Sequence, residues 1–183
     1  HGGILQVKNT SVLCFQERQK GLTEDKKKMA DLALSFIKEQ SLLFFDVSTL
    51  MLEVSQKLTK NVTVYSHSLD NALVLSGKEG IDFHLLGGKF YTKNRFYYSI
   101  HEAQILQHLQ FDLAFFGVAS LSQGLVSFED KEELEISEEV EKLIDNTKFI
   151  GVLQTLENAI KGGRISRLAG SIINTFNFKA LVQ

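Results

Sequence analysis

The side chains of this chain that could bind an anion or transfer a proton lie in three short segments. These are, in chain order, Asp46, Val47, Ser48 and Thr49; Ser66, His67 and Ser68; and Gly87, Gly88 and Lys89. Hydroxyl groups, exposed backbone N–H groups and ammonium groups donate hydrogen bonds to anions, whereas a carboxylate accepts them. We therefore expect a binding site for a small polar or anionic ligand, provided that the fold brings the three segments together.

The first segment follows the apolar run Leu42–Phe45, which reads LLFF. Four consecutive apolar residues without alternation are typical of a strand that is buried on both faces of a parallel sheet. The segment would then form the turn at the carboxyl end of that strand, where α/β sheets bind ligands. A helix opening at about Leu50 would point its free N–H groups and the positive end of its dipole toward the turn. The alternative is that Ser48 or Thr49 only caps this helix.

The second segment has the same pattern as the first. It follows a strand predicted at Val62–Tyr65 and precedes a helix predicted from Leu69 to about Ser76. Strand, helix, strand units are almost always right-handed with parallel strands, so both turns should lie at the same end of the sheet and share a polar crevice. His67 either binds a ligand or satisfies the backbone of the turn. His84, inside the next predicted strand, is interpreted as a structural histidine.

The third segment joins a strand predicted at Asp82–Leu86 to a stretch rich in aromatic residues. Glycine lets the backbone turn sharply or approach a ligand closely, because it has no Cβ. We interpret this segment as the opposite wall of the crevice. The pattern from Phe90 to Tyr98 predicts a β-hairpin that turns at Lys93 and Asn94. Its aromatic side chains either line a subunit interface or cap the sheet.

The remaining segments alternate between helical and strand patterns. Helices are expected at Thr23–Gln40, Ile100–Leu109, Glu129–Glu141 and Ile160–Ile173; strands at Asp112–Phe116, Lys148–Leu153 and Lys179–Val182; and a loop at Ser120–Gly124. This alternation, without an internal repeat or a low-complexity linker, is typical of an α/β domain. We predict a single domain over residues 1–183, with a Rossmann-like, mostly parallel sheet and helices on both faces.

Composition narrows the classes of function. The 183 residues are 44% apolar and 23% charged, as in an ordinary globular protein, and the net charge of −2 provides no basic surface for direct nucleic-acid binding. The single cysteine, Cys14, excludes an internal disulfide and fits a reducing compartment. The sequence shows neither an apolar stretch of membrane length nor a metal-ligand spacing. We therefore expect a cytoplasmic protein with no metal, no cofactor and no membrane partner.

The order of these segments resembles the C-terminal effector-sensing domain of the DeoR family of bacterial transcriptional regulators. The matching pieces are His1-Gly2-Gly3, Glu17-Arg18, Lys26 to Ala30 with Ala33, FFDVST, VTVYSHSL, HLLGGK and DLAFFGVASLSQGL. In that family the corresponding elements are HGG just after a winged helix-turn-helix, then FLD-GTT, TVVTNSL, LLGG and D-AF-G. Five elements agree in order and spacing up to about residue 125, which is hard to obtain by chance.

The resemblance implies a sheet related to ribose 5-phosphate isomerase and the CoA transferases, with no catalysis required. It also implies that a phosphorylated sugar or related metabolite binds at the strand ends, and that the protein is a homodimer or homotetramer. Operator DNA would be bound by an N-terminal winged helix-turn-helix, which is absent from this chain. In this interpretation Asp46 accepts sugar hydroxyls, whereas Ser48, Thr49 and the adjacent helix N-terminus bind the phosphate.

Three elements depart from the family pattern. Val47 stands where the family has the glycine of Gly-Thr-Thr, and His67 stands where it has the asparagine of Thr-Asn-Ser. The family also has Asp-x-Ser-Lys after its fifth strand. Asp145–Lys148 imitates that element by letters but precedes the predicted strand. The positions in structural register are Gln154–Glu157, where the acid and the lysine are missing.

Two alternatives to a sugar-phosphate sensor remain open at this point. A degenerate sensor, kept for oligomerisation with no small-molecule ligand, is favoured by Val47 and by the missing Asp-x-Ser-Lys element. A sugar-phosphate isomerase-like enzyme would need a carboxylate within about 3 Å of the proton that it abstracts. Asp46 and Asp112 are the candidates at strand ends. We predict a sensor without enzymatic activity.

Overall fold

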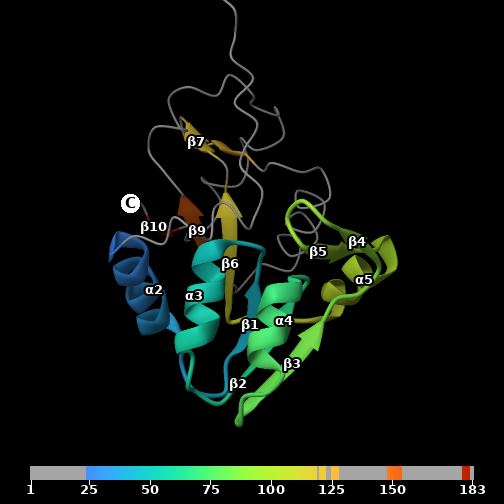
Figure 1. Cartoon of the computed structure of the whole chain (residues 1–183), viewed down its shortest axis with the longest axis horizontal. Helices are drawn as coiled ribbons and strands as arrows, with labels where there is room; N and C mark the ends of the chain where they lie inside the picture. The colour runs from blue at the N-terminus through green and yellow to red at the C-terminus, as the bar shows by residue number, and fades with distance from the viewer. Residues whose placement is uncertain (1–23, 119, 123–124, 128–147, 154–178, 182–183) are drawn as a thin grey trace, which may run out of the picture.

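A computed structural model describes residues 24–118, 120–122, 125–127, 148–153 and 179–181, which are built on one parallel sheet (Figure 1). Its strands are β1 Leu42–Phe45, β2 Val62–Ser66, β3 Ile81–Leu85, β6 Leu113–Val118, β9 Lys148–Leu153 and β10 Lys179–Leu181. They lie in the order β10-β9-β6-β1-β2-β3, and every neighbouring pair is parallel. The predicted α/β class with a mostly parallel, Rossmann-like sheet is confirmed.

Three helices pack side by side in front of the sheet in Figure 1, namely α2 Glu24–Phe36, α3 Thr49–Lys57 and α4 Leu69–Leu75. The second and third of these connect β1 to β2 and β2 to β3, as the strand and helix alternation predicts. The predicted helices at 129–141 and 160–173 lie outside the described residues, and so does Cys14.

Strand β1 is buried on both of its faces, as its run of four apolar residues predicts. Leu43 and Phe45 belong to the main core, together with side chains of α2 and α3. Phe44 points to the opposite face because side chains alternate along a strand. There its ring lies 5.8 Å from the ring of Phe111 and 5.2 Å from that of Phe116, measured between centroids.

The strand order reverses direction next to β1. The chain adds β2 and β3 on one side of β1, and then returns to place β6, β9 and β10 on the other side. At such a reversal the connections leave the sheet in opposite directions, which opens a crevice at the carboxyl ends of the two central strands. The fold therefore favours a ligand site where β1 and β6 end, which is the position of the Asp46 turn.

The aromatic stretch forms the predicted antiparallel hairpin. Its strands are β4 Lys89–Tyr91 and β5 Phe96–Tyr98, with Phe90 opposite Tyr97. The helix predicted after it is shorter than expected, because α5 Ile100–Ile105 gives way to a 3-10 turn rather than continuing to Leu109.

The prediction of a loop at Ser120–Gly124 is wrong. Ser120–Ser122 forms β7, which pairs antiparallel with β8 Leu125–Ser127. Pairing with a second strand satisfies the backbone groups of this polar segment, and a local residue pattern does not reveal such a partner.

Strand β6 also continues beyond Phe116, where the prediction ended it. Gly117 and Val118 pair with Val152 and Leu153 of β9, so the neighbouring strand extends the ladder through the glycine. This extension matters for the site, because it places the backbone N–H of Gly117 beside the end of β1.

Candidate functional site

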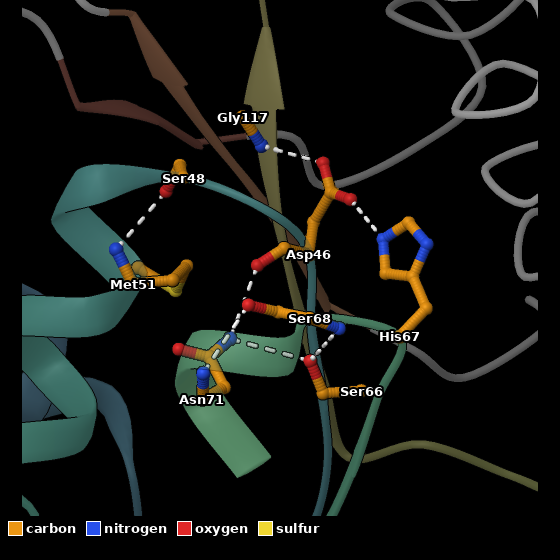
Figure 2. Close-up of polar contacts among 8 residues, drawn as sticks. All are labelled: Asp46, Ser48, Met51, Ser66, His67, Ser68, Asn71 and Gly117. Atoms are coloured by element: carbon orange, nitrogen blue, oxygen red, sulfur yellow. Dashed lines mark hydrogen bonds and ion pairs between the residues drawn. The ribbon is translucent and has the colours of Figure 1, made fainter. Parts of the chain in front are cut away.

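The carboxylate of Asp46 is the centre of a buried polar cluster where β1, β2 and β6 end (Figure 2). Its Oδ1 lies 2.6 Å from Nε2 of His67, and its Oδ2 accepts the backbone N–H of Gly117 at 3.0 Å. Asp46 is 2% exposed and His67 is 0% exposed. Both oxygens of the carboxylate thus have a protein partner, so Asp46 orients the imidazole of His67 as well as ending the strand.

The second ring nitrogen of His67 is a candidate contact for a ligand. The bond to the carboxylate makes Nε2 the hydrogen-bond donor of this ring. Nδ1 lies on the side of the ring away from Asp46 (Figure 2), and it is buried without a hydrogen-bond partner among the described residues. The rings of Phe44 and Phe96 lie 6.0 and 5.2 Å from the imidazole. Since apolar rings cannot satisfy Nδ1, this atom is available to a ligand group or a bound water within the described part of the chain.

Helix α3 begins in the first turn and opens toward this cluster. Ser48 is its N-cap, and the hydroxyl oxygen of Ser48 accepts the backbone N–H of Met51 at 3.0 Å. Capping is therefore confirmed for Ser48. Thr49 is the first residue of the helix, and its buried Oγ1 has no hydrogen-bond partner in the described ranges. Ser48 and Thr49 thus differ, because the hydroxyl of Ser48 caps the helix and the hydroxyl of Thr49 is unsatisfied.

The turn after β2 is closed by Asn71 of α4. The side-chain N–H groups of Asn71 donate to the carbonyl oxygen of Asp46 at 3.3 Å and to Oγ of Ser66 at 3.2 Å, and Oδ1 of Asn71 accepts the hydroxyl of Ser55 at 3.1 Å. Ser68 is the N-cap of α4 and accepts the backbone N–H of Asn71. The oxygens of Ser66 and Ser68 therefore accept hydrogen bonds within the chain, and a ligand contact through either hydroxyl stays a prediction.

Val47 faces the hairpin rather than the polar cluster. It is 4% exposed and packs in a small apolar cluster with Leu52 and Phe96. Phe96 belongs to β5, whose backbone also joins the second turn: the N–H of Tyr97 donates to the carbonyl of His67 at 2.9 Å. The hairpin thus caps the sheet of its own chain, which is one of the two roles expected for its aromatic residues.

An ion pair fastens the same hairpin to α4. The guanidinium of Arg95 donates two hydrogen bonds, of 2.8 and 3.0 Å, to the carboxylate of Asp70. The hydrogen bond that Arg95 donates to Asp70 raises the pKa of Arg95. The backbone carbonyl of Arg95 also accepts the N–H of Leu69 at 3.0 Å. These contacts hold the β5 side of the hairpin against the turn that carries His67.

Gly87, Gly88 and Lys89 lead into this hairpin. Gly88 has a φ of +119°, and a Cβ there would lie 2.3 Å from the carbonyl oxygen of Tyr98, so only glycine fits. Lys89 is exposed, with its ammonium nitrogen 4.9 Å from the centroid of the Tyr91 ring. The role of this segment as the opposite wall of the ligand site stays a prediction.

His84 behaves as the sequence suggests. Its ring stacks on that of Tyr65, with centroids 4.4 Å apart and an interplanar angle of 3°. Its Nε2 lies 3.1 Å from Oδ2 of Asp82 on the same strand. These contacts lie on β3, away from the Asp46 cluster, so His84 is not part of the candidate site.

Two residues of the cluster escaped the sequence analysis. Asn71 lies inside the helix predicted from Leu69, and nothing in its local pattern marks it as the link between two strand ends. Gly117 follows the predicted strand Asp112–Phe116, and its residue type does not reveal that its N–H contacts Asp46. A Cβ on Gly117 would lie 3.0 Å from the Cβ of Ser48 and 3.1 Å from the carbonyl oxygen of Val47, so a side chain there would crowd the first turn.

Two absences are observed in the described part of the chain. No group of three His, Cys, Asp or Glu side chains there is arranged to hold a metal ion. None of the helices in the same ranges has the length and apolar character needed to cross a membrane.

The family model and the relatives that match this chain belong to the same family. Residues 22–150 match the family model described as the DeoR C terminal sensor domain. The chain is 32% identical over 133 residues to the HTH-type transcriptional repressor GlcR of Bacillus subtilis (strain 168), covering 72% of this chain and 52% of that protein. It is 24% identical over 156 residues to the Deoxyribose operon repressor of Escherichia coli (strain K12), covering 80% of this chain and 62% of that protein. The chain thus spans little more than half the length of these relatives.

A solved structure supports the same architecture. The fold is similar to that of ribose 5-phosphate isomerase A from Methanocaldococcus jannaschii, with a TM-score of 0.52 and 13% sequence identity. The match covers 75% of this chain and 55% of the isomerase chain. At this identity the likeness concerns the fold alone.

Proposed function

This chain belongs to the family of DeoR C-terminal sensor domains, and from that premise we propose that it binds a phosphorylated sugar or a related small anionic metabolite. Binding would occur at the Asp46 and His67 cluster. Ligand binding, which we place in the cytoplasm, would change how tightly a DNA-binding module elsewhere in the regulator binds its operator DNA. A coupling free energy of about 1 to 3 kcal/mol between the two sites is enough for such regulation.

The observation that carries this proposal is a pair of unsatisfied buried atoms beside a reversal of strand order. Nδ1 of His67 and Oγ1 of Thr49 are buried without partners among the described residues, although burial of an unpaired polar group costs about 1 to 3 kcal/mol. A fold keeps such atoms where a ligand supplies the missing hydrogen bonds. Thr49 follows the turn after β1, one of the two strands at the reversal, and His67 directly follows β2, the neighbour of β1.

The chemistry of the two atoms fits the two parts of a sugar phosphate. With Nε2 of His67 facing Asp46, Nδ1 is the ring atom left for a hydrogen bond with a sugar hydroxyl, which can both donate and accept. The hydroxyl of Thr49 donates to an anion, and it stands in the first turn of α3, where backbone N–H groups and the helix dipole favour a phosphate. Asp46 acts here as a positioning residue for His67.

Thermal unfolding in the presence of phosphorylated sugars, the matching free sugars and inorganic phosphate tests this function. A ligand at a hundred times its dissociation constant stabilises the fold by about 2.7 kcal/mol, which raises the unfolding midpoint by several degrees. We expect a shift with one sugar phosphate and none with its free sugar. Thr49→Val should reduce that shift to about half or less, whereas Thr59→Val, a matched change at an exposed site, should preserve it.

A second candidate function is a sensor domain that has lost its ligand and serves oligomerisation. The burial of Val47 against Leu52 and Phe96 favours it, because an apolar contact occupies the position where the family has glycine. Unfolding midpoints that stay flat with every ligand, together with a stable oligomer, would support this candidate over the first.

An isomerase-like activity receives less support. The matched relatives are named as transcriptional repressors, and both oxygens of the Asp46 carboxylate have protein partners. Turnover of a sugar phosphate in an isomerase assay would reverse this assessment.

A further inference from the structure

Strand β3 ends the sheet and presents an open edge. In the strand order it has β2 on one side, and it is the last strand on the other side within the described part of the chain. Its sequence, IDFHL, contains no proline and no lysine, the residues that commonly block pairing at sheet edges. Leu85 at its end is 41% exposed, which is unusual for a large apolar side chain on a strand.

The outward-facing backbone groups of β3 follow from its ladder with β2. The N–H of Val62 donates to the carbonyl of Gly80, and the N–H of Leu86 donates to the carbonyl of Ser66. In a parallel ladder the backbone groups of every second residue bond to the neighbouring strand, so the backbone N–H and C=O groups of Asp82 and His84 point toward β2. The C=O groups of Ile81, Phe83 and Leu85, with the N–H groups of the last two, therefore point away from the sheet.

The side chains of β3 are self-complementary about Phe83. If two copies of the strand run antiparallel with Phe83 opposite Phe83, Ile81 of each copy faces Leu85 of the other, and Asp82 of each copy faces His84 of the other. The outward backbone groups then meet as hydrogen-bonded pairs. Asp82 and His84 fall in the intervening non-hydrogen-bonded pairs, where cross-strand side chains are closest.

Charge and exposure agree with this register. The side chains of Asp82 and His84 are 71% and 43% exposed, and the ring of His84 is held by stacking on Tyr65. A carboxylate of one copy would thus meet an orientated imidazole of the second, twice per dimer. Leu73 lies on α4, which packs on β3, and it is 69% exposed.

We propose that β3 is a homodimer interface, in which the edge strands of two copies of this chain pair antiparallel about Phe83 and join two sheets into one. The interface is isologous, because each copy contributes the same residues. It is independent of the Asp46 and His67 site and of the function proposed for that site.

A mixture of two single variants gives the sharpest test. Asp82→His places two imidazoles opposite one another in its homodimer, and His84→Asp places two carboxylates opposite one another. We expect sedimentation velocity to show that each variant dimerises at least about tenfold more weakly than the original chain. Mixing them should restore the dimer, because each carboxylate then faces an imidazole of the other variant. The contact between residues 82 and 84 within one chain is lost in both variants, so it cannot explain the recovery.

A second pair of variants tests the apolar contact. Leu85→Lys should shift the protein toward monomer, because an ammonium group would face Ile81 of the second copy. Leu32→Lys on α2 changes a residue of similar exposure, 48%, away from this edge, and should leave the dimer intact. Amide hydrogen exchange at Phe83 and Leu85 should slow as the concentration of the original chain rises.

Three results would overturn the proposal. They are an original chain that stays monomeric into the high micromolar range, a dimer that Leu85→Lys and His84→Asp leave unchanged, and single variants whose mixture dimerises no better than either alone.

Discussion

The turns after β1 and β2 differ in where their polar groups find partners. After β2, the oxygens of Ser66 and Ser68 are bonded within the turn and to Asn71, a residue of the helix that follows. After β1, the carboxylate of Asp46 reaches across to His67 and Gly117 on two other strand ends, and the hydroxyl of Thr49 stays unsatisfied. The serine oxygens of the second turn are thus bonded within the chain, whereas each turn keeps one unsatisfied buried atom, Oγ1 of Thr49 in the first and Nδ1 of His67 in the second.

This difference suggests that two turns with similar residue types have separate tasks. Ser66, Ser68 and Asn71 stabilise the second turn, and we expect their substitution to be felt mainly in the free energy of unfolding. The candidate ligand contacts are Thr49 in the first turn and His67 in the second, and we expect substitution of these two residues to be felt mainly in ligand affinity. Five variants test the separation, from the largest expected effect on stability to the smallest.

Asn71→Ala should have the largest effect, because it removes the link between the two turns. The change leaves the Asp46 carbonyl and the hydroxyls of Ser66 and Ser55 short of a buried partner, and we expect a loss of about 3 kcal/mol in the free energy of unfolding. Urea denaturation measures it, with Gln56→Ala at an exposed position of α3 as the control. A loss below about 1 kcal/mol would mean that the turns are not joined through Asn71.

Gly117→Ala should have the next largest effect. The new methyl group would lie 3.0 Å from the Cβ of Ser48, so β6 and the first turn must move apart, at a cost of about 2 kcal/mol. Gly87→Ala is the matched control, because nothing lies within 4 Å of a Cβ built there. Equal unfolding midpoints for the two variants would contradict the close packing of β6 against the turn.

Ser48→Ala and Ser68→Ala should have similar effects on stability. Each removes the N-cap of a helix, which costs about 1 kcal/mol. The two variants should differ in ligand affinity, since Ser48 caps α3, whose N-terminus is proposed to bind the phosphate, whereas Ser68 caps α4. Thermal unfolding with and without a sugar phosphate measures both quantities. A ligand effect of the same size in the two variants would remove the distinction between the turns.

Thr49→Val should have the smallest effect on stability and a large one on binding. Replacing an unsatisfied buried hydroxyl by a methyl group of similar size changes the free energy of unfolding by less than about 1 kcal/mol, and can raise it. If Oγ1 contacts a phosphate, the affinity for it should fall about tenfold or more, because a hydrogen bond to a charged group contributes about 1.5 to 3 kcal/mol. Titration calorimetry compares the two, and unchanged affinity would remove Thr49 from the site.

Much of this architecture could be predicted from local pattern. The run Leu42–Phe45 indicated a strand buried on both faces, and the serines before α3 and α4 marked where those helices begin. The hairpin at Phe90 to Tyr98 was also predicted. Each of these features depends on residues that are neighbours in the chain, so the physical cause is visible in a short window of sequence.

Other features depend on partners that a window of sequence does not contain. The residue pattern predicts a loop where β7 forms. It also predicts that β6 ends at Phe116, one residue before the glycine whose N–H donates to Asp46. In both cases a second strand supplies the hydrogen bonds. Polarity alone could not separate Ser66 and Ser68 from Thr49 either, because the difference lies in the position of Asn71.

The amino-acid sequence by itself determined the α/β class, the polar turns at the strand ends and the resemblance to the DeoR sensor domains. These properties follow from apolar runs, helix caps and the order of short motifs. Only the tertiary structure decided which polar atoms are satisfied, that His67 and Asp46 form one buried pair, and that β3 is the edge strand of the described sheet. The physical reason is that hydrogen-bond satisfaction and exposure are properties of atoms brought together from distant parts of the chain.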